Sequence, residues 1–203
     1  MSAAEQKNGV KVFHAKNRKA WRNWLHKNHA TGESVWLVFY KKSADTKSVT
    51  YVEAVEEALC YGWIDSKANK RDKESHLQYF AKRKPKGVWS KINKARIKKL
   101  TEQGLMMPAG LAAIGLAKKN GSWNSLDKID NLEVPPDLKK EFAKNKTAWK
   151  NFQAFAPSSK KLILGWVYNA KRPETREKRV RETITLAAKN IRANHYRPKQ
   201  DGL

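Results

Sequence analysis

The stretch Thr50–Ser66, Thr-Tyr-Val-Glu-Ala-Val-Glu-Glu-Ala-Leu-Cys-Tyr-Gly-Trp-Ile-Asp-Ser, decides the fold of the first half of the chain. It opens with a capping box, in which the Thr50 hydroxyl accepts from the Glu53 amide while the Glu53 side chain reaches back. Apolar residues then recur at helical spacing until Gly62, which supplies the left-handed residue that ends a helix. From Trp63 the period is that of a strand. The stretch therefore predicts a helix that runs directly into a β-strand.

The neighbouring segments extend this α+β pattern. Residues 68–74 are charged and typical of a turn, and His76–Lys82 is expected to pair antiparallel with the strand before it. The continuous apolar run Val35–Tyr40 predicts a central strand, and Asn17 is placed to cap a helix that ends near His29. We therefore predict an antiparallel sheet with helices in the N-terminal half.

The remainder of the chain has helical patterns only. Ser90 caps a helix that Gly104 ends, and Pro108 opens a helix that Gly121 closes. Four further helices are predicted near residues 138–142, 147–155, 158–168 and 174–191. The fold class is α+β with an all-helical C-terminal half, and the domains are expected at residues 1–123 and 124–203.

The composition indicates a folded, basic protein. A hydrophobic content of 40% with eight Trp in 203 residues suffices for a core, and the formal net charge is +24. Such a charge attracts nucleic acid, acidic membranes and acidic proteins alike. The first residues lack an apolar stretch of signal-peptide length, and the longest apolar run, near residues 162–167, is too short to span a bilayer. We therefore expect a cytoplasmic location and no transmembrane segment.

Five blocks carry a resemblance to a known family. They are Glu57–Ser66, Lys82–Pro85, Trp89–Asn93, Gly104–Met106 and Ala170–Arg176. In this order they resemble the YdeI/OmpD-associated family, often called bacteriocin-protection proteins, over about residues 21–191. The chain departs from the family pattern at Ala81-Lys82-Arg83, where a Thr-Pro-Arg step is usual, and at Gly87, where Ser is common. The resemblance implies a phenotype and no established reaction, so it transfers no catalytic residue.

One candidate ligand pocket follows from the predicted hairpin. Asp65, Arg83, Ser90 and Asn93 are expected to converge beside Trp63 and Trp89, and a few polar groups among aromatic rings are typical of a small-molecule site. The alternative is structural: an Asp65–Arg83 ion pair, a helix cap and a satisfied turn.

A second candidate site is a basic stretch. Residues 82–99 hold nine Lys and Arg and no acid, and the candidate anion-binding residues are Lys82, Lys84, Lys86, Lys91, Lys94 and Lys98. A solvated helix face is the alternative, since no diagnostic DNA or RNA motif is present. The later cluster Arg172, Arg176, Lys178, Arg179 and Arg181 is interpreted mainly as a solvated face.

The sequence favours binding over catalysis. We predict a non-enzymatic binding protein for an anionic partner (an acidic protein, nucleic acid or small anion) that contributes to stress or bacteriocin tolerance. The alternatives are nucleic-acid binding through residues 82–99 and an enzyme that acts on an anionic small molecule at Asp65 and Arg83. No cofactor or metal is expected, because His26 and His29 have no third ligand at a familiar spacing. Cys60, the single cysteine, is expected to be a small buried hydrophobe.

Overall fold

The computed structural model describes residues 5–195. The chain forms two compact units, unit 1 up to Ser125 and unit 2 from Leu126 onward. We propose that the two predicted domains correspond to these units.

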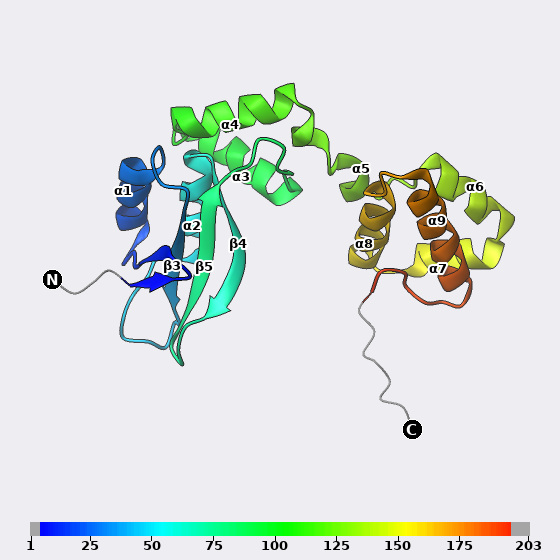
Figure 1. Cartoon of the computed structure of the whole chain (residues 1–203), viewed down its shortest axis with the longest axis horizontal. Helices are drawn as coiled ribbons and strands as arrows, with labels where there is room; N and C mark the ends of the chain where they lie inside the picture. The colour runs from blue at the N-terminus through cyan, green and yellow to red at the C-terminus, as the bar shows by residue number, and fades with distance from the viewer. Residues whose placement is uncertain (1–4, 196–203) are drawn as a thin grey trace. The chain divides into compact units, whose positions relative to one another are not determined.

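Unit 1 is an α+β unit, as predicted (Figure 1). Its described strands are β1 (Gln6–Lys7), β2 (Val10–Phe13), β3 (Ser34–Tyr40), β4 (Trp63–Lys70) and β5 (Ser75–Lys82), in the sheet order β1-β2-β3-β5-β4. Its helices are α1 (Arg18–Asn28), α2 (Tyr51–Cys60), α3 (Lys91–Glu102) and α4 (Pro108–Lys119), followed by the 3₁₀ turn η1 (Ser122–Asn124).

The sheet differs from the prediction at its N-terminal edge. β2 pairs parallel with β3, through Val12 opposite Trp36 and Phe13 opposite Leu37, whereas β3–β5 and β4–β5 are antiparallel as expected. The chain reaches the parallel register because α1 lies between β2 and β3 and provides the crossover that parallel strands require. β3 is thereby enclosed on both edges, in agreement with the predicted central strand.

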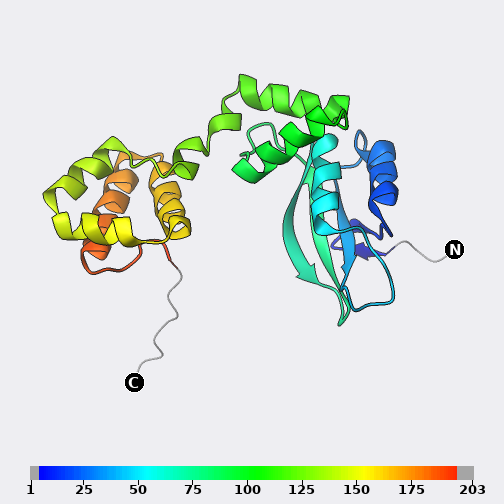
Figure 2. The same cartoon turned by 180° about the vertical axis from the view of Figure 1, so that it is seen from behind.

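Helices α1 and α2 pack on one face of the sheet (Figures 1 and 2). Trp21 of α1 is fully buried there, with its ring 5.4 Å from that of Phe80 on β5. The opposite face buries the smaller cluster Trp36, Val38 and Leu77. The β3 side chains alternate between these two cores, which explains their continuous apolar run.

Two glycines let α2 and α4 meet. Gly62 has φ +73°, the left-handed conformation expected of the residue that ends α2. Gly110 lies on α4, and a Cβ built on it would stand 2.3 Å from the Cys60 carbonyl oxygen. The backbone of α4 therefore touches the last turn of α2 directly.

Unit 2 is all-helical, as predicted. It contains α5 (Asp127–Asp130), α6 (Pro136–Lys144), α7 (Lys146–Ala154), α8 (Pro157–Tyr168) and α9 (Pro173–Ala188). Its core is rich in aromatic rings, such as Phe142, whose ring centroid lies 4.9 Å from that of Phe152. Within the described residues of both units, no helix is long and apolar enough to cross a membrane.

The arginines of α9 are less solvated than the sequence indicated. Arg176 and Arg179 donate to the carbonyls of Val167 and Trp166, at 2.9 and 2.6 Å. These are among the last carbonyls of α8, which lack N–H donors inside their own helix. Two members of the predicted solvated cluster therefore cap α8, and Arg176 also pairs with Asp137 of α6 at 2.7 Å.

Candidate functional site

The six predicted pocket residues fall into three groups, of which the first is built on Asp65. Its Oδ2 accepts from the Tyr51 hydroxyl at 2.7 Å and from Gln78 at 3.5 Å. Burial and the bond to this carboxylate raise the pKa of Tyr51 to about 12. Asp65 thus joins the start of α2 to the sheet, and its partners are these side chains instead of Arg83.

The second group is Arg83 on Trp89. The guanidinium carbon lies 3.5 Å from the centroid of the buried Trp89 ring, and Nη1 donates to the Val88 carbonyl at 3.1 Å. The buried Nε has no hydrogen-bond partner among the described residues. Desolvation lowers the pKa of Arg83 to about 10, although the charge of Asp65 opposes this shift. Stacking on the indole face compensates part of the cost of burying the guanidinium.

The third group is structural in its contacts. Ser90 caps α3 by accepting from the Asn93 amide at 3.2 Å, and Asn93 Oδ1 accepts from Arg96 at 2.9 Å. Trp63 is fully buried in the main core and donates to the His29 carbonyl at 3.4 Å. Ligand binding by the six residues remains a prediction.

The arrangement around Trp89 includes a residue that the sequence did not single out, Trp123. The two ring centroids lie 5.1 Å apart, and the ammonium groups of Lys94 and Lys118 lie 5.4 and 5.5 Å from the Trp123 centroid. Arg83 and Trp89 therefore form a cation–aromatic stack, and Trp123 contacts Trp89 with its ring tilted by 46° and with two lysine ammonium groups over it. Trp123 follows Gly121 in a stretch typical of a turn, so no local pattern indicates this contact.

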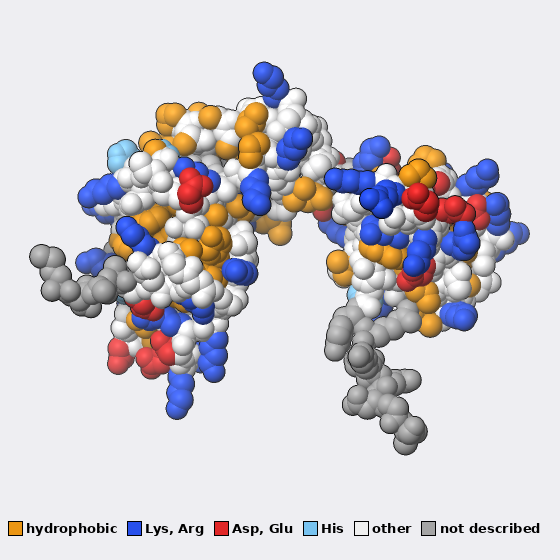
Figure 3. Space-filling model, in the orientation of Figure 1, with side chains coloured by type: hydrophobic (Ala, Val, Ile, Leu, Met, Phe, Trp, Pro, Cys, Tyr) orange, Lys and Arg blue, Asp and Glu red, His pale blue; other side chains and the backbone are white. Residues whose placement is uncertain are grey.

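The region around this stack is strongly basic. Residues 82–125 hold eleven Lys and Arg and only one acid, Glu102. They therefore carry a large share of the formal net charge of +24 of the chain. On the face shown in Figure 3, several acidic side chains of unit 1 gather at its lower end, away from α4. We call residues 82–125 the basic segment.

The candidate lysines of the basic segment differ in how they are engaged. Lys82 donates to the Ala30 carbonyl at 2.7 Å and lies 3.3 Å from Glu33, so it is tied to the loop before β3. Lys98 lies 4.0 Å from Glu102 at the surface, a weak contact. The exposed members are Lys84, Lys86, Lys91 and Lys98, and Lys94 is half-buried.

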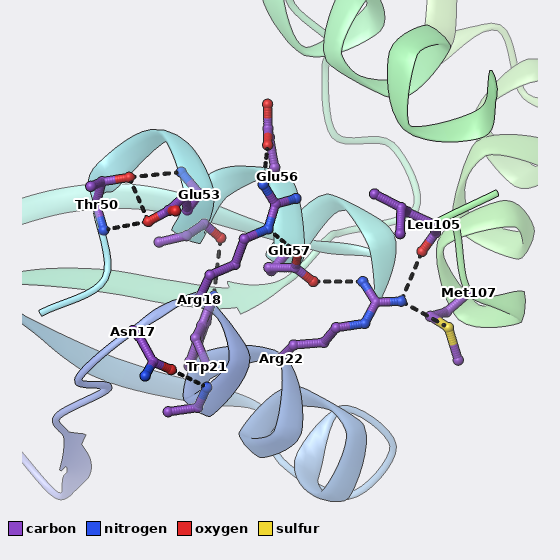
Figure 4. A network of polar contacts seen from close by, with 12 residues as sticks. Asn17, Arg18, Trp21, Arg22, Thr50, Glu53, Glu56, Glu57, Leu105 and Met107 are labelled. Atoms are coloured by element: carbon purple, nitrogen blue, oxygen red, sulfur yellow. Dashed lines mark hydrogen bonds and ion pairs between the residues drawn. The ribbon is translucent and has the colours of Figure 1, made fainter. Parts of the chain in front are cut away.

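A second polar cluster, which was not predicted, is built on Glu57, the first residue of the block Glu57–Ser66 (Figure 4). Glu57, with a side chain only 3% exposed, accepts from Arg18 at 2.6 Å and from Arg22 at 2.7 Å. Arg22 also donates to the Leu105 carbonyl at 3.0 Å. Two features of the sequence could have indicated this cluster. Arg18 and Arg22 are four residues apart on α1, and two glutamates lie inside an apolar helix. The cluster ties α1, α2 and the segment before α4 together.

The thiol beside this cluster is inert. Cys60 is buried, as predicted, and desolvation raises its pKa to about 11, although Arg22 opposes the shift. Such a thiol is neutral at physiological pH and a poor nucleophile. Among residues 5–195 there is no group of three or more His, Cys, Asp or Glu side chains that could hold a metal ion.

Comparison with known families divides the chain as its structure does. Residues 131–190 match the family described as "Bacteriocin-protection, YdeI or OmpD-Associated". The chain carries a YdeI/OmpD-associated domain. This domain includes the block Ala170–Arg176, in which Arg176 joins α9 to α6 and α8.

The other four resemblance blocks lie outside the YdeI/OmpD-associated domain. They fall in residues 13–113, which match a separate family model described as a domain of unknown function, DUF8412. No curated protein and no solved structure matches the chain.

Proposed function

We propose that this YdeI/OmpD-associated protein is a non-enzymatic, cytoplasmic binding protein whose basic segment in unit 1 holds an anionic partner. The observation that carries the proposal is the concentration of eleven Lys and Arg against a single acid in residues 82–125. Unit 2, from residue 126 onward, holds eighteen Lys and Arg against nine acids, so its positive charge is far more diluted. A cluster of positive charge on a protein surface attracts a partner of negative charge.

The geometry supports binding at this place for a second reason. Arg83 is held by stacking on the buried Trp89 and by the Val88 carbonyl, so this guanidinium is fixed in place before a partner arrives. A preorganised surface loses less conformational entropy on binding than a flexible one. The exposed lysines around it supply the long-range attraction.

A charge-matched comparison tests the proposal. One variant replaces Lys84, Lys86 and Lys91 by Glu, and the control replaces the exposed unit 2 lysines Lys139, Lys150 and Lys189 by Glu. Both variants change the net charge equally, so a general field effect is the same in each. We expect the first variant to elute from a heparin column at clearly lower salt than the control. Equal shifts in both variants would overturn the proposal.

The physiological part of the proposal follows from the family. We propose that the bound partner links the protein to stress or bacteriocin tolerance. A strain lacking the gene should lose survival under bacteriocin challenge, the unit 2 control should restore it, and the Lys84/Lys86/Lys91 variant should not. Restoration by both variants would separate the phenotype from the basic segment.

A further inference from the structure

A groove between α3 and α4 combines apolar walls with lysines. It has a volume of about 450 Å³ and is lined by Ile97, Leu111, Ile114, Trp123, Lys98 and Lys118, among others. Leu111 is 50% exposed although it is a large apolar residue. Among the described residues that line this groove, Glu102 is the single acid. A ligand that fits it must have an apolar, preferably flat, body and a negative charge.

The surroundings of Trp123 narrow the class of ligand that this groove can hold. One ring neighbour is Trp89, which holds the indole in position, and the ammonium groups of Lys94 and Lys118 lie within 5.5 Å of its centroid. These ammonium groups lie over the indole, so a flat ring that shares the indole with them would bring its own anionic groups close to both. Stacking of a base on an aromatic side chain with lysines along the phosphates is how proteins hold nucleotides without reading their sequence.

We propose that the α3–α4 groove binds a nucleotide unit, with the base against Trp123 and the phosphate toward Lys118 and Lys98. This inference rests on the proposed function and names its ligand class. The nucleotide unit is either free or part of a single strand, and both share the same base and phosphate chemistry.

Two oligomers of equal charge separate the contribution of base stacking to binding from that of the phosphates. The probes are a labelled single-stranded deoxythymidine oligomer and an abasic oligomer with the same number of phosphates, measured by fluorescence anisotropy at fixed salt. We expect the thymidine oligomer to bind at least about fivefold more tightly, since each stacked base adds to the affinity. Trp123→Ala should remove this difference, Trp123→Phe should keep most of it, and circular dichroism checks that both variants fold.

Adjacent lysines provide the control for position. Lys118 lines the groove and Lys119, next to it at the exposed end of α4, is not among its lining residues. Lys118→Gln should weaken binding of the thymidine oligomer several-fold more than Lys119→Gln, although both remove one charge. Equal effects of the two substitutions, or equal affinity for the two oligomers, would overturn the groove as the site. Salt-sensitive heparin binding would survive that outcome, so the proposed function is tested separately.

A third probe, adenosine monophosphate, distinguishes the source of the nucleotide unit. Binding of the free nucleotide as tight as that of an oligomer, and dependent on Trp123, assigns the groove to free nucleotides. Much tighter, salt-dependent binding of the oligomer assigns it to a single strand.

Discussion

Each unit contains an arginine–carboxylate cluster, and the two clusters differ in how deeply the carboxylate is buried. In unit 1 the carboxylate of Glu57 is buried, at 3% exposure, and clamped between two arginines of α1. In unit 2 the carboxylate of Asp137 is 44% exposed, although Arg176 donates to it at 2.7 and 2.9 Å, distances close to those at Glu57. Similar distances thus describe one pair inside the protein and one at its surface. The difference teaches that burial, more than hydrogen-bond length, decides what such a pair contributes.

This contrast also separates structural charge from binding charge. The Glu57 cluster satisfies its arginines within unit 1, whereas the exposed lysines of the basic segment face few acids. A partner would meet mostly solvated lysines there, such as Lys98 with its weak surface contact to Glu102, but it would have to break a buried ion pair to reach Arg18 or Arg22. The basic segment is therefore the better candidate for binding.

The largest effect is expected from breaking the buried pair. Glu57→Ala leaves Arg22 without its carboxylate and Arg18 with Glu56 alone next to the core, and should lower the stability of unit 1 by about 3 kcal/mol. Asp137→Ala removes a largely solvated partner and should cost less than about 1 kcal/mol in unit 2. Urea denaturation, with hydrogen exchange read in peptides from each unit, measures both. Equal losses would show that burial does not set the difference.

A second, smaller contrast concerns glycines in helices. In unit 1, Gly110→Ala forces a Cβ against the Cys60 carbonyl and should destabilise by about 2 kcal/mol, because backbone has to move. In unit 2, the Cβ of Gly165→Ala would meet Ile129 at an ordinary 3.7 Å, so the better helix propensity of Ala should raise stability by about 0.5 kcal/mol.

Thermal unfolding of the two variants checks the opposite signs. Gly115→Ala is the control within α4, since nothing lies within 4 Å of its Cβ. It should behave like Gly165→Ala. A stable Gly110→Ala would mean that α4 does not need direct backbone contact with α2.

Local signals made much of the fold predictable. The caps at Asn17, Thr50 and Ser90 each form the hydrogen bond that the sequence indicates, because a cap and its helix are neighbours in the chain. β2 was missed because it is only four residues long and is stabilised by β3, more than twenty residues away. Its parallel pairing depends on tertiary contacts that no local pattern encodes.

The candidate site was predictable only in part for the same reason. The basic residues of 82–99 and the aromatic Trp89 are close in the chain and could be found together. Trp123 and Lys118 meet them only because α4 folds back beside α3. The same holds for Asp65, because helix α2 separates it in the chain from its hydrogen-bond partner Tyr51. Which polar residue pairs with which other is a property of packing, and the sequence indicated only the candidates.

The smallest expected effect is a difference between the units at alkaline pH. Burial raises the pKa of the Cys60 thiol to about 11, and an unfolded cysteine ionises near pH 8.5. The unfolded state therefore loses a proton that the folded state keeps as the pH rises, so the stability of unit 1 is fully present below about pH 8.5 and declines above it. Unit 2 contains no cysteine, so its stability should stay constant until the pH approaches about 10, where tyrosines and lysines of the unfolded chain begin to titrate. Urea midpoints between pH 7 and about 9.5, below the range in which unfolded tyrosines ionise, measure the decline. Hydrogen exchange assigns it to a unit, and Cys60→Ala should remove most of it. A decline that persists in Cys60→Ala, or that appears equally in unit 2, would mean that another group carries the pH dependence.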